Sequence, residues 1–351
     1  MKNKDIGTVQ KFIKTEILEI QSRLSSQQRK IVDEIKDHLT KGFYNLEKTN
    51  CPCGNQSSET LSPTDIFGFP MNYIICSKCG IIRQERCLDD PSLKNFYQFY
   101  FRKLYRRSGT VNQRFFDRQH RRALILFDLI KDKIEIDEIK NVLDYGCSAG
   151  GYLKVFNDIG LKSIGLDYDK NYIDFGRNFF GLNLKFGGLE KLTGDSFDLI
   201  ILNHVLEHMP HPVDFITSLK NHLNENGKLL ISVPNLNNFF YRKNQPLSGQ
   251  FHIAHIFLYS PKNLSNLITN LGFNSIYSNQ KIDAIFKKTN NQKTVRLSSE
   301  YNEIINFCYN WFKSPIFSKW LTVSKAWPHR INHAIQKHQF KAKKLSLKNS
   351  P

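Results

Sequence analysis

The chain lacks any apolar run of about 18 residues or more, the length that predicts a transmembrane helix. Its first six residues also lack the apolar core of a secretory signal. We therefore expect a cytoplasmic protein without a transmembrane segment. In that compartment its seven cysteines favour metal ligands or free thiols over disulfide bonds. A length of 351 residues is enough for a full core and for more than one folded unit.

Acidic residues are missing from the end of the chain. The 48 residues after Glu303 contain no Asp or Glu and nine Lys or Arg. Residues 97–122 contain eight Lys or Arg and a single acidic residue, Asp117. The two stretches contribute nine and seven charges, which is sixteen of the net charge of +18. This concentration favours an anionic partner, although a solvated basic face would give the same composition.

Three kinds of anionic partner fit this charge distribution. The first is an anionic or nucleotide-linked sugar, the second is RNA, and the third is an anionic membrane surface touched by the basic tail. Aromatic residues interleaved with arginine over residues 97–107 are compatible with RNA. No recognisable RNA-binding module accompanies them, so the sequence favours the small molecule.

A glycine needed for binding dinucleotides is also missing. Residues 142–156 predict a buried strand, a glycine turn and the start of a helix. After Gly146 the next glycine is Gly150, and Cys147 and Ser148 stand where a dinucleotide fingerprint has its second glycine. Because a pyrophosphate needs that glycine for close approach, NAD and FAD are disfavoured.

Two carboxylates accompany this turn. Asp144 precedes it, where it would repel a pyrophosphate but suit an ammonium group. Asp167 ends the next predicted strand, 21 residues after Gly146. A nucleotide-binding βαβ unit places its ribose-binding carboxylate at this separation. The pattern therefore indicates a nucleoside ligand, with an ordinary strand–turn–helix as the alternative.

With these residues the chain resembles class I S-adenosylmethionine-dependent methyltransferases, whose first motif is similar to D-x-G-C-x-x-G. The resemblance implies that the turn borders the methionine moiety, that Asp167 holds the ribose hydroxyls, and that the end of the third strand lies against the adenine. The residues it assigns to S-adenosylmethionine are Asp144, Gly146, Cys147, Gly150, Asp167, Tyr168, Gly188, Leu189 and Asn203.

Alternating strands and helices predict a doubly wound, Rossmann-like α/β fold. The resemblance implies seven strands, which we expect at 141–145, 162–167, 183–187, 197–202, 228–233, 274–279 and 282–288. The expected units are a helical N-terminal segment (1–49), a zinc-binding module (50–108), the methyltransferase domain (109–288) and a basic helical C-terminal extension (289–351).

The zinc prediction comes from two cysteine pairs, each followed by glycine. They are Cys51-Pro-Cys53 and Cys76-x-x-Cys79, and four such thiolates make a tetrahedral structural zinc site. A single residue separates the first pair where two are usual, so Cys87 could replace one ligand. Buried free cysteines are the alternative, and redox use of the second pair is a weaker one.

Residues 50–90, which we call the cysteine unit, also indicate which molecule accepts the methyl group. Residues 51–105 resemble the N-terminal zinc-binding part of bacterial sugar and small-molecule methyltransferases, in which C-x-x-C-G precedes a Phe- and Tyr-rich segment. The resemblance implies methyl transfer to a sugar or saccharide precursor. RNA methylation and a non-catalytic, cofactor- or partner-binding protein are the alternatives.

Four histidines have positions suited to chemistry. His204 and His208 belong to Asn203-His-Val-Leu-Glu-His208, which follows the fourth strand and resembles the V-L-E-H segment of this group. His252 and His255 lie in an insert before a predicted helix at residues 261–273. Removal of the acceptor's proton usually requires His or a carboxylate.

We predict His255, His252 and His204 as candidate bases, and His208 as an orienter of the loop. A structural histidine is the alternative for the two in the insert. The segment is also similar to E-x-x-E-H, which binds a divalent cation in some ubiquinone-pathway and small-RNA methyltransferases. His204 stands at the first position of that motif, so the match is incomplete. The zinc-peptidase pattern H-x-x-E-H is rejected, because it requires a long helix.

Overall fold

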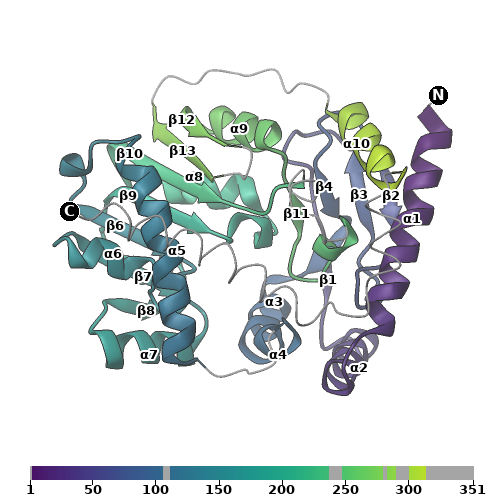
Figure 1. The fold of residues 1–351 in the computed structure, drawn as a ribbon, viewed down its shortest axis with the longest axis horizontal. Coiled ribbons are helices and arrows are strands. Elements are labelled where there is room, and N and C mark those ends of the chain that lie inside the picture. Colours follow the sequence, from purple (N-terminus) through teal and green to yellow (C-terminus); the bar gives the residue numbers. More distant parts are fainter. Residues whose placement is uncertain (1, 106–110, 237–246, 280–282, 290–299, 314–351) are drawn as a thin grey trace, which may run out of the picture.

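The computed structural model describes residues 2–105, 111–236, 247–279, 283–289 and 300–313. Two halves lie side by side in Figure 1. One is built on a seven-stranded sheet, and the other on a four-stranded sheet with the N-terminal helices at its outer side. No helix in the described ranges is both long and apolar enough to cross a membrane.

The seven-stranded sheet has the order β12-β13-β10-β9-β6-β7-β8. Strands β10, β9, β6, β7 and β8 run parallel, while β13 is antiparallel to both of its neighbours. This confirms the predicted Rossmann-like fold. The strands are β6 (Asn141–Tyr145), β7 (Lys162–Asp167), β8 (Leu184–Phe186), β9 (Phe197–Asn203), β10 (Leu223–Ser232), β12 (Phe273–Ser278) and β13 (Asp283–Lys288).

Helices cover both faces of this sheet (Figure 1). Helix α5 buries Phe115, Ala123, Leu126 and Ile130 on one face, as their spacing predicts, and the side chain of Asn112 caps its first turn. The helices are α5 (Gln113–Lys131), α6 (Leu153–Asp158), α7 (Lys170–Phe180), α8 (Pro212–Asn221) and α9 (Pro261–Asn270).

The chain leaves β6 toward β7 on one side, and β9 pairs with β6 on the other. The order of the strands therefore reverses at β6. Open α/β sheets bind ligands at such a switch point, beyond the carboxyl ends of the strands. In this protein that edge carries Asp144, Asp167 and Asn203 near or at the ends of β6, β7 and β9.

The second sheet combines two distant parts of the sequence. Three of its strands belong to the cysteine unit: β2 (Ser58–Ser62), β3 (Tyr73–Cys76) and β4 (Ile82–Gln84). The fourth is β11 (Phe257–Leu258), from the insert that precedes α9, and it pairs antiparallel with β4. The insert is thus part of both halves of the molecule. A separate ribbon is formed by β1 (Leu46–Lys48) and β5 (Arg86–Leu88).

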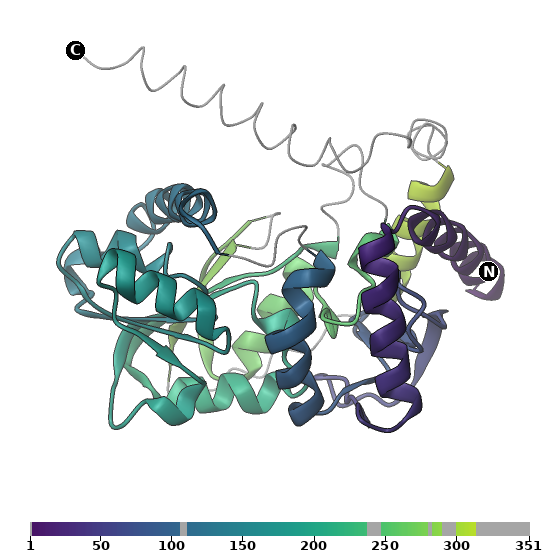
Figure 2. The same cartoon turned by 90° about the horizontal axis from the view of Figure 1, so that it is seen from below.

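Three further helices flank the cysteine unit (Figure 2). Helices α1 (Lys2–Ser22) and α2 (Ser26–Thr40) form the predicted N-terminal segment, and α10 (Tyr301–Lys313) packs on α1. A Cβ at Gly80, whose φ is 78°, would lie 2.9 Å from the backbone of Glu300. The start of α10 therefore lies directly over the second cysteine pair. The other residues of the expected C-terminal extension, 290–299 and 314–351, lie outside the described residues.

The Phe- and Tyr-rich segment connects the two halves. It forms α3 (Asp90–Phe96), a π-helical turn at Tyr97–Phe101 and α4 (Arg102–Tyr105). The side chain of Asp89 caps α3 by accepting a hydrogen bond from the backbone of Ser92. This helical run lines the switch point of the large sheet from the side opposite the strands.

Candidate functional site

A cavity of about 560 Å³ opens at the carboxyl ends of β6, β7 and β9. Its walls come from the strand ends and from α3, α4, α5 and α8. Five of the predicted cofactor residues line it: Asp144, Gly146, Asp167, Tyr168 and Asn203. Four other predicted cofactor residues do not line it: Cys147, Gly150, Gly188 and Leu189. Gly187, the residue before Gly188, does line it.

The glycine turn is held by the next strand. The backbone N–H groups of Gly146 and Cys147 both donate to the carbonyl of Leu166, at 2.8 and 3.0 Å. Gly146 has a φ of 78°, and a Cβ there would lie 2.6 Å from Val205. Only glycine fits this position without displacing the segment that follows β9.

Asp167 is fixed by the same turn. Its Oδ2 accepts the backbone N–H of Ser148 at 2.7 Å, and its Oδ1 accepts that of Asp169 at 2.8 Å. Each oxygen retains a further lone pair for a ligand. This is the arrangement expected of a carboxylate that receives a pair of neighbouring hydroxyl groups.

Asp144 is a buried carboxylate with one oxygen that lacks a hydrogen-bond partner among the described residues. It is 2% exposed, and the oxygen concerned is Oδ2. Burial, and secondarily the charge of Asp167, raise the pKa of Asp144 well above its usual value. A buried carboxylate oxygen is costly without a partner, so the site is suited to a ligand with an ammonium group.

Arg102 is a site residue that the sequence analysis did not identify. Its guanidinium lies 3.2 Å from Asp169, donates to the Ser148 hydroxyl at 3.1 Å, and stacks 4.1 Å from the ring of Tyr172. It thereby joins α4 to the glycine turn and to the start of α7. The only signal in the sequence was the charge excess of residues 97–122.

The structure brings all four candidate histidines together but at different depths. His204 and His208 line the cavity, with 56% and 12% of their side chains exposed. The ring of His255 lies 5.0 Å from that of His208 and 3.7 Å from that of His252, and neither His255 nor His252 lines the cavity. The roles of His252 and His255 as bases therefore stay predictions.

Burial keeps the inner histidines neutral. It lowers the pKa of His208 and lowers those of His252 and His255 well below their usual value. The carboxylate of Glu207 lies 1% exposed between the two outer rings, 3.1 Å from His204 Nδ1 and 3.7 Å from His208 Nε2. Ligand atoms of Glu207, His208 and His255 fall within 4.8 Å of one another, a spacing that a cation could also use.

The four cysteines of the predicted zinc site also meet. The Sγ atom of Cys51 lies 3.3 Å from that of Cys53 and 3.5 Å from that of Cys79, and Cys53 lies 3.6 Å from Cys76. The glycines after the pairs have positive φ, and the backbone N–H groups of Gly54 and Gly80 turn back to the carbonyls of Cys51 and Cys76. The single intervening proline does not prevent convergence.

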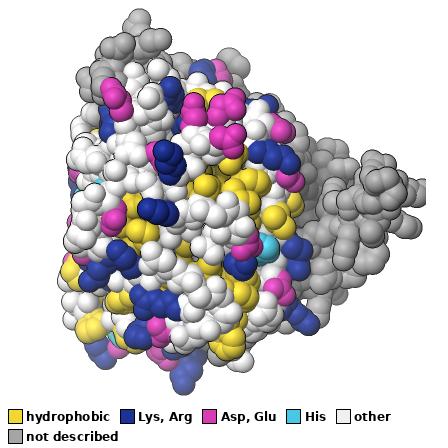
Figure 3. All heavy atoms as spheres, turned by 90° about the vertical axis from the view of Figure 1, so that its left-hand side faces the viewer, with side chains coloured by type: hydrophobic (Ala, Val, Ile, Leu, Met, Phe, Trp, Pro, Cys, Tyr) yellow, Lys and Arg dark blue, Asp and Glu magenta, His cyan; other side chains and the backbone are white. Residues whose placement is uncertain are grey.

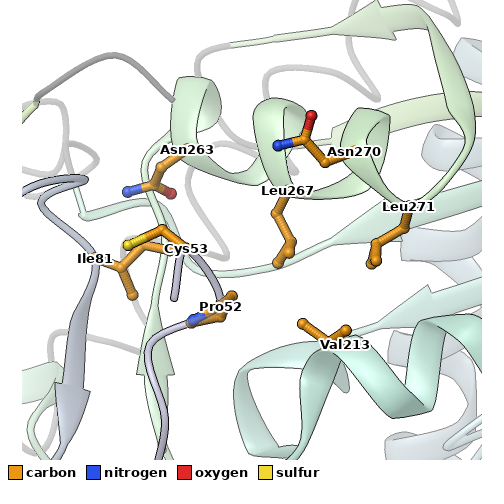
Figure 4. Close-up of a pocket in the computed structure, with 8 residues that line it drawn as sticks. All are labelled: Pro52, Cys53, Ile81, Val213, Asn263, Leu267, Asn270 and Leu271. Carbon is orange, nitrogen blue, oxygen red and sulfur yellow. The ribbon is translucent and has the colours of Figure 1, made fainter. Parts of the chain in front are cut away.

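The alternative ligand, Cys87, is buried in β5 and is not part of this cluster. Figure 4 shows a small cavity of about 80 Å³ between Cys53 and helices α8 and α9. Apolar side chains such as Val213, Leu267 and Leu271 make up most of its wall. Too few polar groups converge there to orient a ligand, so we regard it as a packing gap.

Comparison with known proteins agrees with the geometry of the large cavity. Residues 113–278 match the family model described as a methyltransferase domain. A probable S-adenosylmethionine-dependent methyltransferase of Mycolicibacterium smegmatis is 27% identical over 137 residues, which is 38% of this chain and 52% of that protein. A tRNA U34 carboxymethyltransferase of Nautilia profundicola is 30% identical over 129 residues, 34% of this chain and 42% of that protein.

A ubiquinone biosynthesis O-methyltransferase of Coxiella burnetii is 31% identical over 105 residues, 28% of this chain and 45% of that protein. The chain thus spans about half the length of the curated relatives it matches. The match to a methyltransferase domain covers residues 113–278, and the sheet topology and the glycine turn of that segment agree with the class I S-adenosylmethionine-dependent pattern expected from the sequence. The cysteine unit lies outside the segment matched by that family model.

Proposed function

We propose that the protein transfers a methyl group from S-adenosylmethionine to a small polar acceptor, a sugar or saccharide precursor. One observation carries the proposal. The partnerless carboxylate of Asp144 and the ribose-type carboxylate of Asp167 line the same cavity as His204 and His208. A methyl donor and a proton acceptor therefore have places within one cavity.

The residues present fit S-adenosylmethionine. Asp144 would receive its ammonium group, Asp167 would receive the ribose hydroxyls, and the backbone at Gly187 would lie against the adenine. When bound, the donor supplies a methyl group already activated on a sulfonium. The protein then has to position the acceptor in line with that methyl and remove a proton from it.

Two arginines support an anionic acceptor. Arg118 and Arg122 lie one turn apart on α5 and both line the cavity. Neither arginine forms an ion pair with an acidic side chain among the described residues. A single arginine is enough for the carboxylate of the methyl donor, so the second is available to a carboxylate or phosphate of the acceptor. A nucleotide-linked sugar would satisfy this requirement.

RNA is the second candidate, because the net charge is +18 and one relative is named as a tRNA-modifying enzyme. On the face seen in Figure 3, however, Lys and Arg side chains are interspersed with Asp and Glu. A continuous basic surface is not present on that face. Contact of the basic tail with an anionic membrane concerns residues outside the described ranges.

We also propose that the cysteine cluster holds a structural zinc ion. A tetrahedral site with zinc–sulfur bonds of about 2.3 Å has its sulfur atoms about 3.8 Å apart. The Sγ separations of 3.3 to 3.6 Å are close to this value. With four thiolates as ligands, no position would remain for a substrate. The zinc would therefore stabilise the fold and take no part in methyl transfer.

Two measurements test the proposed function. Calorimetry should detect S-adenosylmethionine binding to the intact protein, and Asp144→Asn should weaken it. Incubation with labelled S-adenosylmethionine and fractionated cell extract should then label a low-molecular-mass fraction. Label in RNA would favour the second candidate, and binding without any labelled product would indicate a non-catalytic protein.

A further inference from the structure

The loop that carries His252 and His255, residues 250–256 (the histidine loop), is held by the cysteine unit. The side-chain amide nitrogen of Gln84 lies within hydrogen-bond distance of the carbonyls of His252, Ile253 and His255, at 3.3, 3.2 and 3.2 Å. The Tyr73 hydroxyl lies 2.9 Å from two of the same carbonyls. Tyr73 and Gln84 are both fully buried, on the strands that flank the second cysteine pair.

One carbonyl of the histidine loop points the other way. The carbonyl of Ala254 lies 2.5 Å from Nδ1 of His208. A carbonyl can only accept, so this nitrogen must carry the proton, and Nε2 of the neutral ring keeps a lone pair. The histidine loop therefore determines which nitrogen of His208 can receive a proton.

Backbone hydrogen bonds continue the same connection. The N–H of Gln84 donates to the carbonyl of Ile256 at 2.9 Å, and the N–H of Ile256 donates to the carbonyl of Glu207 at 2.8 Å. The carboxylate of Asp65 accepts the N–H of Ile253 at 2.9 Å. Hydrogen bonds thus link the cysteine unit to the histidine loop, and the histidine loop to Glu207, the residue before His208.

From this geometry we propose that His208 is the catalytic base that takes the acceptor's proton, and that Tyr73 and Gln84 are positioning residues that act on it through Ala254. The inference rests on the proposed methyl transfer. It assigns the cysteine unit a role on the acceptor side of the cavity.

Nε2 of His208 takes the proton of an acceptor hydroxyl while that oxygen forms a bond to the methyl carbon. The bond between this carbon and the sulfonium breaks, and its electron pair stays on sulfur, which gives S-adenosylhomocysteine. The imidazolium of His208 lies 3.7 Å from the Glu207 carboxylate, which stabilises its charge until the proton leaves.

His208 is better placed for this role than the other three histidines. His252 and His255 do not line the cavity. His204 does, but 56% of its side chain is exposed, whereas 12% of the His208 side chain is. A mostly buried base whose ring is held by a fixed carbonyl needs less reorganisation of ring and solvent than an exposed base.

The first test uses the intact protein without any acceptor. Long-range proton–nitrogen spectra of protein labelled with nitrogen-15 in histidine, assigned with His208→Gln, report which ring nitrogen carries the proton. We expect the Nδ1–H form for His208, and a mixture of both forms in Tyr73→Phe. A matched control is Tyr44→Phe, which also loses a buried hydroxyl bond, to Asn95 at 2.7 Å, but is not bonded to the histidine loop. A proton on Nε2 in the wild type would contradict the proposal.

The second test measures transfer of label from S-adenosylmethionine to the fraction that accepts it. We expect His208→Gln to lower turnover by about 100-fold or more, and Tyr73→Phe by about 10-fold, which corresponds to about 1.4 kcal/mol. Affinity for S-adenosylmethionine should change less than twofold in both. Gln84→Leu should repeat the Tyr73→Phe result, and Tyr44→Phe should behave as the wild type.

Three outcomes would overturn the assignment. The first is a large loss in His204→Gln while His208→Gln keeps full turnover. The second is dependence of turnover on added Mg²⁺ or Mn²⁺, with calorimetric binding of that ion lost in His208→Gln, which would make the group a cation site. The third is normal turnover in both variants of the positioning residues. A wild type that fails to bind S-adenosylmethionine would instead refute the proposed function, and the base with it.

Discussion

The two sides of the cavity are built in different ways. The cofactor side comes from one short stretch, Asp144 to Asp167, in which a strand, a turn and the next strand supply both carboxylates. The acceptor side is assembled from the cysteine unit, the π-helical turn, the segment after β9 and the histidine loop. If the proposed roles hold, a local motif binds the common donor, whereas the acceptor is recognised by parts that meet only on folding.

Loss of the cysteine cluster should give the largest difference between the two sides of the cavity, in turnover compared with S-adenosylmethionine affinity. Structural zinc contributes about 10–16 kcal/mol in small fingers, so Cys76→Ser with Cys79→Ser should unfold the cysteine unit and abolish turnover. The carboxylates proposed to receive S-adenosylmethionine belong to the other sheet, so the affinity for it should fall far less. Metal content, thermal unfolding and calorimetry measure the three effects.

The control for that experiment is Cys87→Ser, which lies outside the cluster and should retain one zinc per chain. Loss of zinc in this variant would show that Cys87 is a ligand after all. Complete loss of S-adenosylmethionine binding in the double variant would mean that the two sides fold as one unit.

Gly146→Ala tests the cofactor side. The new Cβ would lie 2.6 Å from Val205 at a φ of 78°. We expect a loss of about 2–4 kcal/mol in the free energy of unfolding from backbone strain and overpacking, together with weaker S-adenosylmethionine binding. Urea unfolding and calorimetry provide both values.

Gly160→Ala is the matched control, with a φ of 83° and no atom within 4 Å of its added Cβ. It should cost about 1–2 kcal/mol, the backbone strain alone, and leave cofactor affinity unchanged. Equal losses in the two variants would show that contact with Val205 is unimportant.

Asp144→Asn should weaken S-adenosylmethionine binding and, at high pH, raise the stability of the free protein. The variant removes the charge that would meet the ammonium group, so affinity for S-adenosylmethionine should fall by about 1–3 kcal/mol. Because the folded-state pKa of Asp144 is raised, its ionisation destabilises the free protein as pH rises through that pKa. The variant should therefore be more stable than the wild type at high pH and no more stable at low pH.

The same pKa shift predicts that wild-type affinity for S-adenosylmethionine increases as pH rises, since the ammonium requires an ionised partner. In Asp144→Asn this increase should disappear. Calorimetry across pH, paired with thermal unfolding of the free protein, measures both; an unchanged pH dependence would remove Asp144 from the ammonium site.

Arg102→Lys should give the smallest effect. A lysine keeps the charge near Asp169 but cannot also reach the Ser148 hydroxyl in the same planar geometry. We expect a loss of about 1 kcal/mol in S-adenosylmethionine affinity, since the glycine turn is less firmly held. A larger fall in turnover than in affinity would place Arg102 on the acceptor side instead.

Much of the large sheet could be predicted from the sequence. The strands expected at 141–145 and 162–167 have these bounds in the structure, because buried apolar runs beside a glycine turn leave few alternatives. The insert before α9 has no periodic pattern, because its two-residue strand β11 is too short for one. Pairing of β11 with β4, about 170 residues earlier, depends on tertiary contact alone.

In the candidate site, too, some residues could be predicted from the sequence and others could not. Asp144 and Asp167 are identified by their spacing around a turn, since a βαβ unit fixes where both carboxylates lie. The order in depth of the four histidines has no counterpart in the sequence, and nor does the bond from Ala254 to His208. Sequence by itself determined the donor's binding motif, because local backbone geometry creates it. Only the tertiary structure decided which histidine reaches the cavity, because that depends on how the cysteine unit packs on the sheet.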